Sequence, residues 1–318
     1  MFRPLNAMDS LLPISALIPT RNRSTALTRT LQSLAQQSVQ PAEAIIIDGS
    51  DDGATQALCQ HPVAGLATSL DCRPAKQLGA ALQRNQGIAH ATQNAIWLLD
   101  DDVLLEPECL ARLWQALQSD SNLGGVNATI TNQQYSPPGR ASRWLFRFLN
   151  GRWEPSYAGK CIGPALNLLP EDRPDLPEVV PVEWLNTTCT LYRREVLPEP
   201  LFPECFQGYS LLEDVTLSLT VGKRWKLANA RTARIFHDSQ PGDHKDDPRT
   251  LAWMDLVNRY YVMTAVLERT RLLDYLKLGV QQLFDIVAVL AARRDWRFTQ
   301  RFLQGKLRGI RDLVSSDC

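Results

Sequence analysis

Several features that mark large classes of protein are missing from this sequence. Charge of one sign is not in excess, because 34 lysine and arginine residues balance 34 aspartate and glutamate residues among the 318. A net charge of zero argues against a nucleic-acid partner. The seven cysteines show none of the paired spacings of zinc or redox motifs. We therefore expect unpaired thiols in a reducing compartment.

Long hydrophobic runs are scarce as well. The first residues hold no basic segment followed by a long apolar one, so we expect no signal peptide. The most apolar late stretch, Leu272 to Ala292, contains Asp274, Lys277 and Asp285, and we expect that it does not span a membrane. The length suits two domains, or one large domain with an appendage.

Short apolar runs alternate with helical patterns over the first 120 residues. Strands are predicted at Ile14–Ile18, Ala44–Ile47 and Ala95–Leu99, and helices between and after them, the first one capped by Ser24. Strands that alternate with helices predict a mostly parallel, doubly wound α/β sheet with right-handed crossovers. The strand ends after Ile18, Ile47 and Leu99 then lie along one edge, where such sheets bind ligands.

The pattern changes after residue 130. Eight prolines between residues 131 and 181 are expected to break any long element, and the aromatic residues among them favour a long, shaped loop over the sheet. A strand is expected at 187–192, a helix beginning at Glu213 and a last strand at 234–236, before a helical region from Thr250. We expect a catalytic domain over 1–245, divided near 130 into a donor half (14–130) and an acceptor half (131–245), and a helical extension over 246–318.

Three consecutive aspartates, Asp100 to Asp102, follow the strand predicted at Ala95–Leu99. Carboxylates this close repel one another unless a cation lies between them, and hydrated Mg²⁺ or Mn²⁺ prefers such oxygen ligands. The alternative is a turn in which an aspartate caps the next helix. The triplet alone leaves both interpretations open.

Together with other motifs, the triplet resembles the family 2 glycosyltransferases, inverting enzymes of the type A nucleotide-diphosphosugar transferase fold. The matching segments, over residues 14 to 240, are Ile18-Pro19-Thr20-Arg21-Asn22-Arg23, Ile46-Ile47-Asp48-Gly49-Ser50, Arg84-Asn85-Gln86-Gly87-Ile88, Leu98-Leu99-Asp100-Asp101-Asp102, Glu213-Asp214 and His237. Their order and spacing both fit the family. The resemblance implies a doubly wound fold and a nucleotide-sugar donor.

The resemblance also implies a role for most of these residues. The nucleotide would be bordered by Pro19, Thr20, Arg21, Arg23, Asp48, Ser50, Arg84, Asn85, Asp100 and Asp101. Asp48 would accept hydrogen bonds from the base or the ribose, although it could equally hold a turn at Gly49. Arg84 would face a phosphate or brace an aspartate, unless it is a solvated helix arginine.

The implied metal ligands are Asp100, Asp102 and His237, with Mn²⁺ or Mg²⁺ as the cofactor; His244 is a weaker alternative to His237. Inverting transfer also needs a base for the acceptor hydroxyl. Asp214 matches the family's base carboxylate and Glu213 is the neighbouring candidate. The alternative for both is a favourable interaction with the dipole of the helix that they begin.

The acceptor is expected over the later half of the chain. Trp184, Thr187 and Tyr209 are the predicted acceptor residues, and Trp144 and Trp153 are further aromatic candidates, although any such ring can also belong to the core.

The last predicted helix carries arginines on one side and apolar residues on the other. The arginines are Arg294, Arg297, Arg301 and Arg308, and the apolar residues Leu303, Leu307, Ile310 and Val314. Such a helix packs its apolar stripe on the catalytic domain or lies on an anionic membrane.

These observations predict a metal-dependent, inverting transferase that moves a sugar from a nucleotide diphosphate to a glycan or lipid-linked glycan. We expect it in the cytoplasm, at the inner face of the cell membrane if the last helices bind lipid. A nucleotidyltransferase usually needs a glycine-rich phosphate loop, and Pro19 to Arg23 contains no glycine. A nucleotide-sugar-binding protein without turnover is the non-enzymatic alternative.

Overall fold

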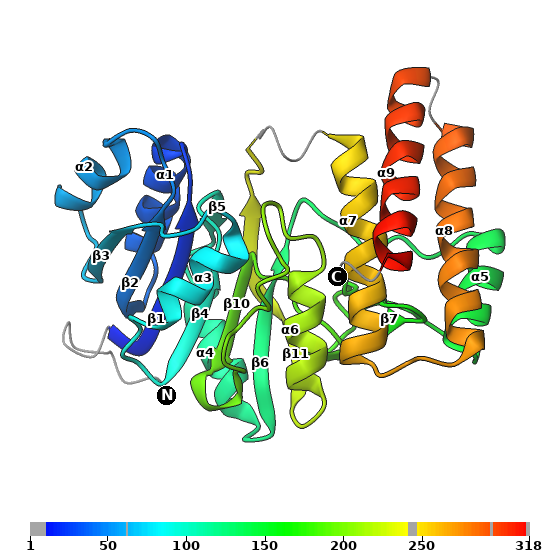
Figure 1. Ribbon diagram of the computed structural model, residues 1–318. Coiled ribbons are helices and arrows are strands. Elements are labelled where there is room, and N and C mark those ends of the chain that lie inside the picture. Colours follow the sequence, from blue (N-terminus) through cyan, green and yellow to red (C-terminus); the bar gives the residue numbers. More distant parts are fainter. Residues whose placement is uncertain (1–10, 62, 241–246, 293–294, 316–318) are drawn as a thin grey trace.

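The computed structural model describes residues 11–61, 63–240, 247–292 and 295–315 (Figure 1). A nine-stranded sheet runs through its centre in the order β3-β2-β1-β4-β10-β6-β11-β5, with β9 paired to β11. Its strands are β1 (Leu11–Thr20), β2 (Gln40–Asp48), β3 (Ser69–Pro74), β4 (Ala95–Leu99), β5 (Val103–Leu105), β6 (Leu123–Ile130), β9 (Val179–Val182), β10 (Cys189–Arg193) and β11 (Lys226–His237). β1 to β4 are mutually parallel and β11 is parallel to β6, while β5, β9 and β10 run antiparallel to their neighbours. The predicted mostly parallel α/β fold is confirmed.

Helices cover both faces of the sheet. α1 (Ser24–Ala35), α2 (Ala54–Gln60) and α4 (Cys109–Ser119) pack on one face, and α3 (Ala80–Ile88) and α6 (Glu213–Gly222) on the other. Side chains alternate along each central strand: Trp97 faces α1 and α4, and Leu98 belongs to the opposite cluster. This burial on both faces explains why β4, at the centre of the sheet, is apolar throughout. Ser24 is the first residue of α1 and does not cap it, because the N-cap position is Arg23.

The proline-rich region contains more regular structure than the sequence predicted. α5 (Arg140–Asn150) is an 11-residue helix between Pro138 and Pro155, and β7 (Cys161–Ile162) pairs with β8 (Leu166–Asn167) in a separate two-stranded sheet. The expectation that prolines break every long element was wrong here, because the segment between these two prolines contains none. Gly151, at φ +79°, ends the helix in the left-handed conformation.

Three helices follow the sheet. α7 (Pro248–Tyr261) starts at Asp247, whose carboxylate accepts hydrogen bonds from the backbone amides of Arg249 and Thr250, and a five-residue π-helical turn (Val262–Val266) extends it. α8 (Leu272–Ala292) and α9 (Trp296–Val314) then pair beside α5 and α7 (Figure 1). Gly305 lets α9 approach α7 closely, because a Cβ atom at this position would lie 2.1 Å from the carbonyl oxygen of Arg249.

The polarity of α8 and α9 is inverted relative to an ordinary surface helix. Their buried side holds a polar network in which the Lys306 ammonium donates to Asp255 (2.7 Å) and to Gln282 (2.5 Å). Although burial alone would raise it, the cations of Arg259 and Lys306 hold the pKa of Asp255 well below its usual range. Leu307, Ile310 and Val314 instead face solvent. The interpretation that this apolar stripe packs on the catalytic domain was therefore wrong.

One helix in the described part of the chain, α8, is long and apolar enough to cross a membrane by length and composition alone, which is weak evidence against the expectation that this stretch does not span one. Gln281 and Gln282, at the middle of α8, are buried. The helix is thus attached to the protein through its polar side.

Candidate active site

The ends of β1 and β2 are locked together above the sheet. The Gln83 side-chain amide on α3 donates to the carbonyl oxygens of Thr20 (3.0 Å) and Ile47 (2.7 Å). The backbone amide of Gly49 donates to Thr20 as well, at 2.9 Å. Asn22, in a left-handed conformation at φ 54°, donates its backbone amide to the Ser50 hydroxyl. The two loops that follow these strands therefore form one rigid edge.

Asp48 lies at this edge and holds the turn that follows it. Its Oδ1 accepts hydrogen bonds from the backbone amide (2.9 Å) and the hydroxyl (2.5 Å) of Ser50. This is the turn that the sequence left open as an alternative to base recognition. Asp48 and Ser50 thus lie beside Thr20, as predicted, and Arg21 is near the same loop through Asp51, at 4.0 Å.

The three aspartates have three different environments. Asp101 is buried and accepts a hydrogen bond from the Thr20 hydroxyl at 2.6 Å. Burial raises the pKa of Asp101 to about 6, against the effect of that hydrogen bond and of the nearby Arg23 cation. Arg23 lies 3.4 Å from both Asp101 and Asp102. Arg23 thus braces the triplet from the side of β1, and Pro19, one residue before Thr20, lies in β1 itself.

Asp100, Asp102 and His237 come together as predicted. One ligand atom of each lies within 4.8 Å of those of the other two, and His237 Nε2 is 3.1 Å from Asp102 Oδ1. The Gln133 side chain lies 3.4 Å from the second ring nitrogen, Nδ1, and Asn132 exchanges hydrogen bonds with the His237 backbone. Two carboxylates and an imidazole of fixed orientation suit a divalent cation such as Mn²⁺ or Mg²⁺. His244 lies outside the described residues.

Arg84 joins this cluster to the start of α6. Its guanidinium is almost completely buried, and its two terminal nitrogens lie 2.5 Å from Asp100 Oδ1 and 2.6 Å from Glu213 Oε1. Arg84 therefore braces an aspartate, which is one of the alternatives left open by the sequence, and it is not a solvated helix arginine. A single cation thus bridges carboxylates from two distant parts of the chain.

Glu213 and Asp214 are the first two residues of α6, and their side chains differ in burial and in the groups that they contact. Glu213 is buried, is paired with Arg84 and lies 3.4 Å from the Thr187 hydroxyl. Burial raises its pKa to about 7, although Arg84 opposes that shift. Asp214 is only half-buried; it accepts a hydrogen bond from the Val215 backbone amide at 2.7 Å, and burial raises its pKa to about 6. Among the described residues, Asp214 is therefore the carboxylate of this pair without an arginine ion pair.

The backbone before this pair is strained. Ser210 and Leu212 have positive φ angles of 56° and 70°, which cost free energy in residues other than glycine. Just before them, Gly208 forms an isolated bridge to Gly79, whose own φ is 123°. A Cβ atom on Gly79 would lie 3.0 Å from the Gly208 backbone nitrogen, so this approach requires a glycine.

The remaining predicted residues fall into two groups. Thr187 and Tyr209 lie near the carboxylates; burial, followed by the charge of Asp100, raises the pKa of the half-exposed Tyr209. Asn85 instead exchanges two hydrogen bonds with the backbone of Phe202 and so holds the loop there. The prediction that Trp184 contacts the acceptor was wrong: its ring is buried in a core cluster and its indole N–H donates to the Leu168 carbonyl.

Two contributors to the site were missed by sequence reasoning. Gln83 precedes the Arg84-Asn85 motif by one residue, and a polar residue on the apolar side of a predicted helix was the available signal. Gln133 lies in the proline-rich region, and nothing in its sequence context indicates that it lies beside His237.

Comparison of the fold with solved structures defines the class of the protein. Residues 1–349 of TarS from S. aureus superpose with a TM-score of 0.55 and 15% identity, over 92% of this chain and 78% of TarS. A mannosyltransferase from Pyrobaculum calidifontis, solved with GDP-Man and Mn²⁺, gives a TM-score of 0.54 and 14% identity over 94% of this chain and 87% of that chain. The chain thus has the type A glycosyltransferase fold.

The sequence comparison then gives the family. The model of Glycosyl transferase family 2 matches residues 15–198, more than half of the chain, so the chain belongs to this family. An uncharacterized glycosyltransferase of Bacillus subtilis, YwdF, is 28% identical over 107 residues, which are 33% of this chain. The match covers only 38% of the length of YwdF.

Proposed function

We propose that the protein is a metal-dependent, inverting glycosyltransferase that transfers a sugar from a nucleotide diphosphate to a hydroxyl of a glycan or lipid-linked glycan. One observation carries the proposal: the Asp100, Asp102 and His237 cluster and the Glu213-Asp214 pair converge on Arg84. A group that binds the leaving diphosphate and a group that accepts a proton are thus adjacent. The proposed catalytic unit is 1–245, with its donor and acceptor halves meeting near 130, and 246–318 is the extension.

The donor site in this proposal is the edge formed by β1, β2 and β4. Thr20, Arg21, Asp48 and Ser50 border it, and TarS and the mannosyltransferase were solved with UDP-GlcNAc and GDP-Man, respectively. When bound, the divalent cation would neutralise negative charge on the departing diphosphate. Asp101 and Arg23 have a supporting role, since their contacts are with Thr20 and with the triplet itself.

Asp214 is the proposed base. The acceptor hydroxyl oxygen forms the new bond to the anomeric carbon, the bond from that carbon to the diphosphate oxygen breaks with its electron pair, and the hydroxyl proton passes to Asp214. The pKa of about 6 supports this role, because the carboxylate is ionised at neutral pH and still basic. Glu213 is less suited, because it is buried and its Oε1 is held by Arg84.

The test is a panel of nucleotide sugars with Mn²⁺, with Mg²⁺ and with chelator alone, scored for nucleotide release. We expect release that requires the metal and that falls about 10²–10⁴-fold in Asp214→Asn. Metal-independent release would contradict the metal site, and a fully active Asp214→Asn would contradict the base. The absence of release with every donor, with nucleotide binding retained, would favour a binding protein without turnover.

A peripheral membrane contact belongs to the same proposal and would place the enzyme at the cytoplasmic face of the cell membrane. Large exposed apolar side chains gather on α5, α8 and α9: Trp144, Phe148, Leu272, Leu273, Leu276, Leu283, Val287, Leu290, Trp296, Leu307, Ile310 and Val314. The arginines at 140, 147 and 297 on α5 and α9 are exposed, and no ion pair of theirs is found among the described residues. Apolar faces with unpaired cations nearby match an anionic lipid surface, on which the inverted helices α8 and α9 would lie with their polar side still toward the protein.

Sedimentation with vesicles tests this contact. We expect the protein to pellet with phosphatidylcholine vesicles that contain one quarter phosphatidylglycerol, less so at high salt, and Leu283→Ser/Val287→Ser to stay in solution. Leu11→Ser, an exposed leucine on β1, is the matched control and should pellet like the wild type. Equal recovery of the double variant and the wild type in the pellet would show that these helices are not the contact.

A further inference from the structure

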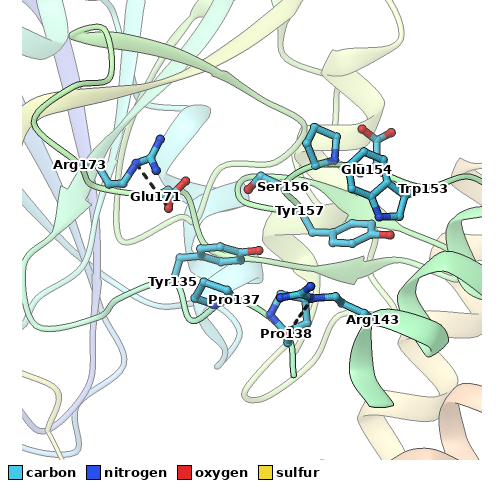
Figure 2. Close-up of a pocket in the computed structure, with 11 residues that line it drawn as sticks. Tyr135, Pro137, Pro138, Arg143, Trp153, Glu154, Ser156, Tyr157, Glu171 and Arg173 are labelled. Atoms are coloured by element: carbon cyan, nitrogen blue, oxygen red, sulfur yellow. Dashed lines mark hydrogen bonds and ion pairs between the residues drawn. The ribbon is translucent and has the colours of Figure 1, made fainter. Parts of the chain in front are cut away.

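The proline-rich region encloses two adjoining cavities on the acceptor side of the site. The larger, of about 390 Å³, is lined by the segments 135–143, 153–157 and 171–173 (Figure 2). The smaller, of about 210 Å³, is lined by residues from the ends of β6 and β11 and by Asn186. Tyr135, Glu171 and Arg173 line both. The two cavities therefore adjoin at these side chains.

Two residues that line the smaller cavity connect it to the candidate active site. Gln133 lines it and lies 3.4 Å from the imidazole of His237. Asn186 lines it from the other side, and the next residue, Thr187, lies 3.4 Å from Glu213. A molecule that fills this cavity would thus be separated from His237 by the side chain of Gln133.

Two buried polar atoms in these walls lack a partner among the described residues. They are the Asn186 side-chain oxygen, in the smaller cavity, and the hydroxyl of Tyr157, whose side chain lines the larger one. Both residues are more than nine-tenths buried. Neither atom is exposed to water, so each wall holds a polar group whose hydrogen bond is not made among the described residues.

The larger cavity has the composition of a sugar site. Tyr135, Trp153 and Tyr157 supply aromatic rings from two facing loops, and Ser156 adds a hydroxyl (Figure 2). Trp153 is 66% exposed, an unusual exposure for so large a ring, which suits a stacking platform at the rim. Aromatic faces with a few polar groups are what the apolar face and the hydroxyls of a pyranose require.

Some of the charged side chains that line the larger cavity have an ion-pair partner and one does not. Glu154 is neutralised from outside by Lys160 (2.5 Å) and Arg152 (2.6 Å), and Glu171 lies 3.6 Å from Arg173. Arg143 donates to the carbonyl oxygen of Pro138 at 3.2 Å, and no acidic partner of its guanidinium is found among the described residues. One cation in the cavity is therefore available for an anionic substituent.

From this arrangement we infer that the two cavities are the acceptor subsites of the proposed transfer, and that they take an anionic oligosaccharide. Its terminal sugar occupies the smaller cavity with the attacked hydroxyl toward Asp214. The following sugars stack on Tyr135 and Trp153, with a carboxylate or phosphate group against Arg143. The orientation of the oligosaccharide, with its terminal sugar nearest the carboxylates, rests on the proposed function. Its binding rests on the cavities alone.

Binding to an array of immobilised oligosaccharides tests the inference independently of catalysis. The array would carry chains of one to six sugars, neutral and with uronate or phosphate groups, and be probed with labelled protein. We expect the wild type to retain anionic chains of two or more sugars, and Trp153→Ala and Tyr135→Ala to weaken this retention at least tenfold. Arg143→Gln should weaken the anionic chains and not the neutral ones. Arg112→Gln, an exposed arginine on α4 away from the cavities, is the matched control.

Each outcome decides the matter. Wild-type protein that retains no oligosaccharide, or variants that retain them as the wild type does, would overturn the inference. Equal loss of anionic and neutral chains in Arg143→Gln would overturn its charge requirement. Failure of the proposed function would give a different pattern of results. The protein would still retain oligosaccharides on the array, but no nucleotide sugar would bind or release its nucleotide.

Discussion

Replacing Arg84 tests the electrostatic design of the site most directly. The substitution Arg84→Met removes the only cation within ion-pair distance of both Asp100 and Glu213 in the described part of the chain, and it keeps much of the side chain's length. Glu213 is 7% exposed and has little access to water that could replace the guanidinium. We therefore expect destabilisation, because Glu213 must then either stay charged without its partner or take up a proton inside the protein.

The size of the effect follows from burial. Removing one partner of a buried ion pair costs about 3–5 kcal/mol. With a urea dependence of about 3 kcal/mol per M for a chain of this size, the midpoint should fall by about 1–1.7 M. Arg29→Met is the matched control, because Arg29 lies 2.5 Å from Asp238, as Arg84 lies 2.5 Å from Asp100, but both side chains of that pair are partly exposed. An exposed pair contributes about 0–1 kcal/mol, so this control should shift the midpoint by less than about 0.3 M.

Urea unfolding followed by circular dichroism measures both variants. The double variant Arg84→Met/Glu213→Gln should regain part of the lost stability, because it also removes the charge that Arg84 compensates. Similar urea midpoints for Arg84→Met and Arg29→Met would refute the reasoning, because the contribution of each ion pair to stability would then not depend on its burial. A double variant that loses the sum of the single effects would refute the pairing itself.

Two more predictions concern the base and the helix packing. Because the pKa of Asp214 is raised to about 6 and a protonated carboxyl cannot accept a proton, kcat/KM should be constant above about pH 7 and fall roughly tenfold per pH unit well below 6. The residual kcat/KM of Asp214→Asn should not show this fall at acid pH. If the fall persists in the variant, it is caused by the titration of another group. Gly305→Ala should lower the melting temperature, because its Cβ atom meets the Arg249 carbonyl oxygen, at a cost of about 1–3 kcal/mol. Gly279→Ala, with no atom within 4 Å of the added Cβ, should leave the melting temperature equal or higher, and the same loss in both variants would rule out close packing as the cause.

The first half of the fold was predictable because its strands are buried on both faces. Ile14–Ile18 and Ala95–Leu99 are apolar for that reason, and their order with the helices sets the topology. β11 was predicted only at 234–236, although the strand starts at Lys226. Its middle is polar because Asn229 bonds to Asn127 and Thr129 on the neighbouring strand, an arrangement that no local pattern reveals.

The candidate site was predictable where motifs are local and not where partners are distant. The triplet, Glu213-Asp214 and His237 were found by motif, and Asp100, Asp102 and His237 do lie together. That Arg84 lies between the triplet and a residue 129 positions later depends on how the sheet is wound. Trp184 was misplaced because an aromatic ring beside a functional loop and one in the core look alike in sequence.

The larger cavity in Figure 2 has a consequence for how this enzyme could change. Its lining comes entirely from residues 135–173, which leave the sheet after β6 and rejoin it at β9, whereas the donor edge is built from strands that precede them. A gene exchange with crossovers near 131 and 178 would replace that cavity in one event and spare the nucleotide and metal residues. Under the inference drawn above, the preference for the sugars beyond the terminal one is carried by this single insert, and chimaeras that exchange it are the natural route to new glycan products.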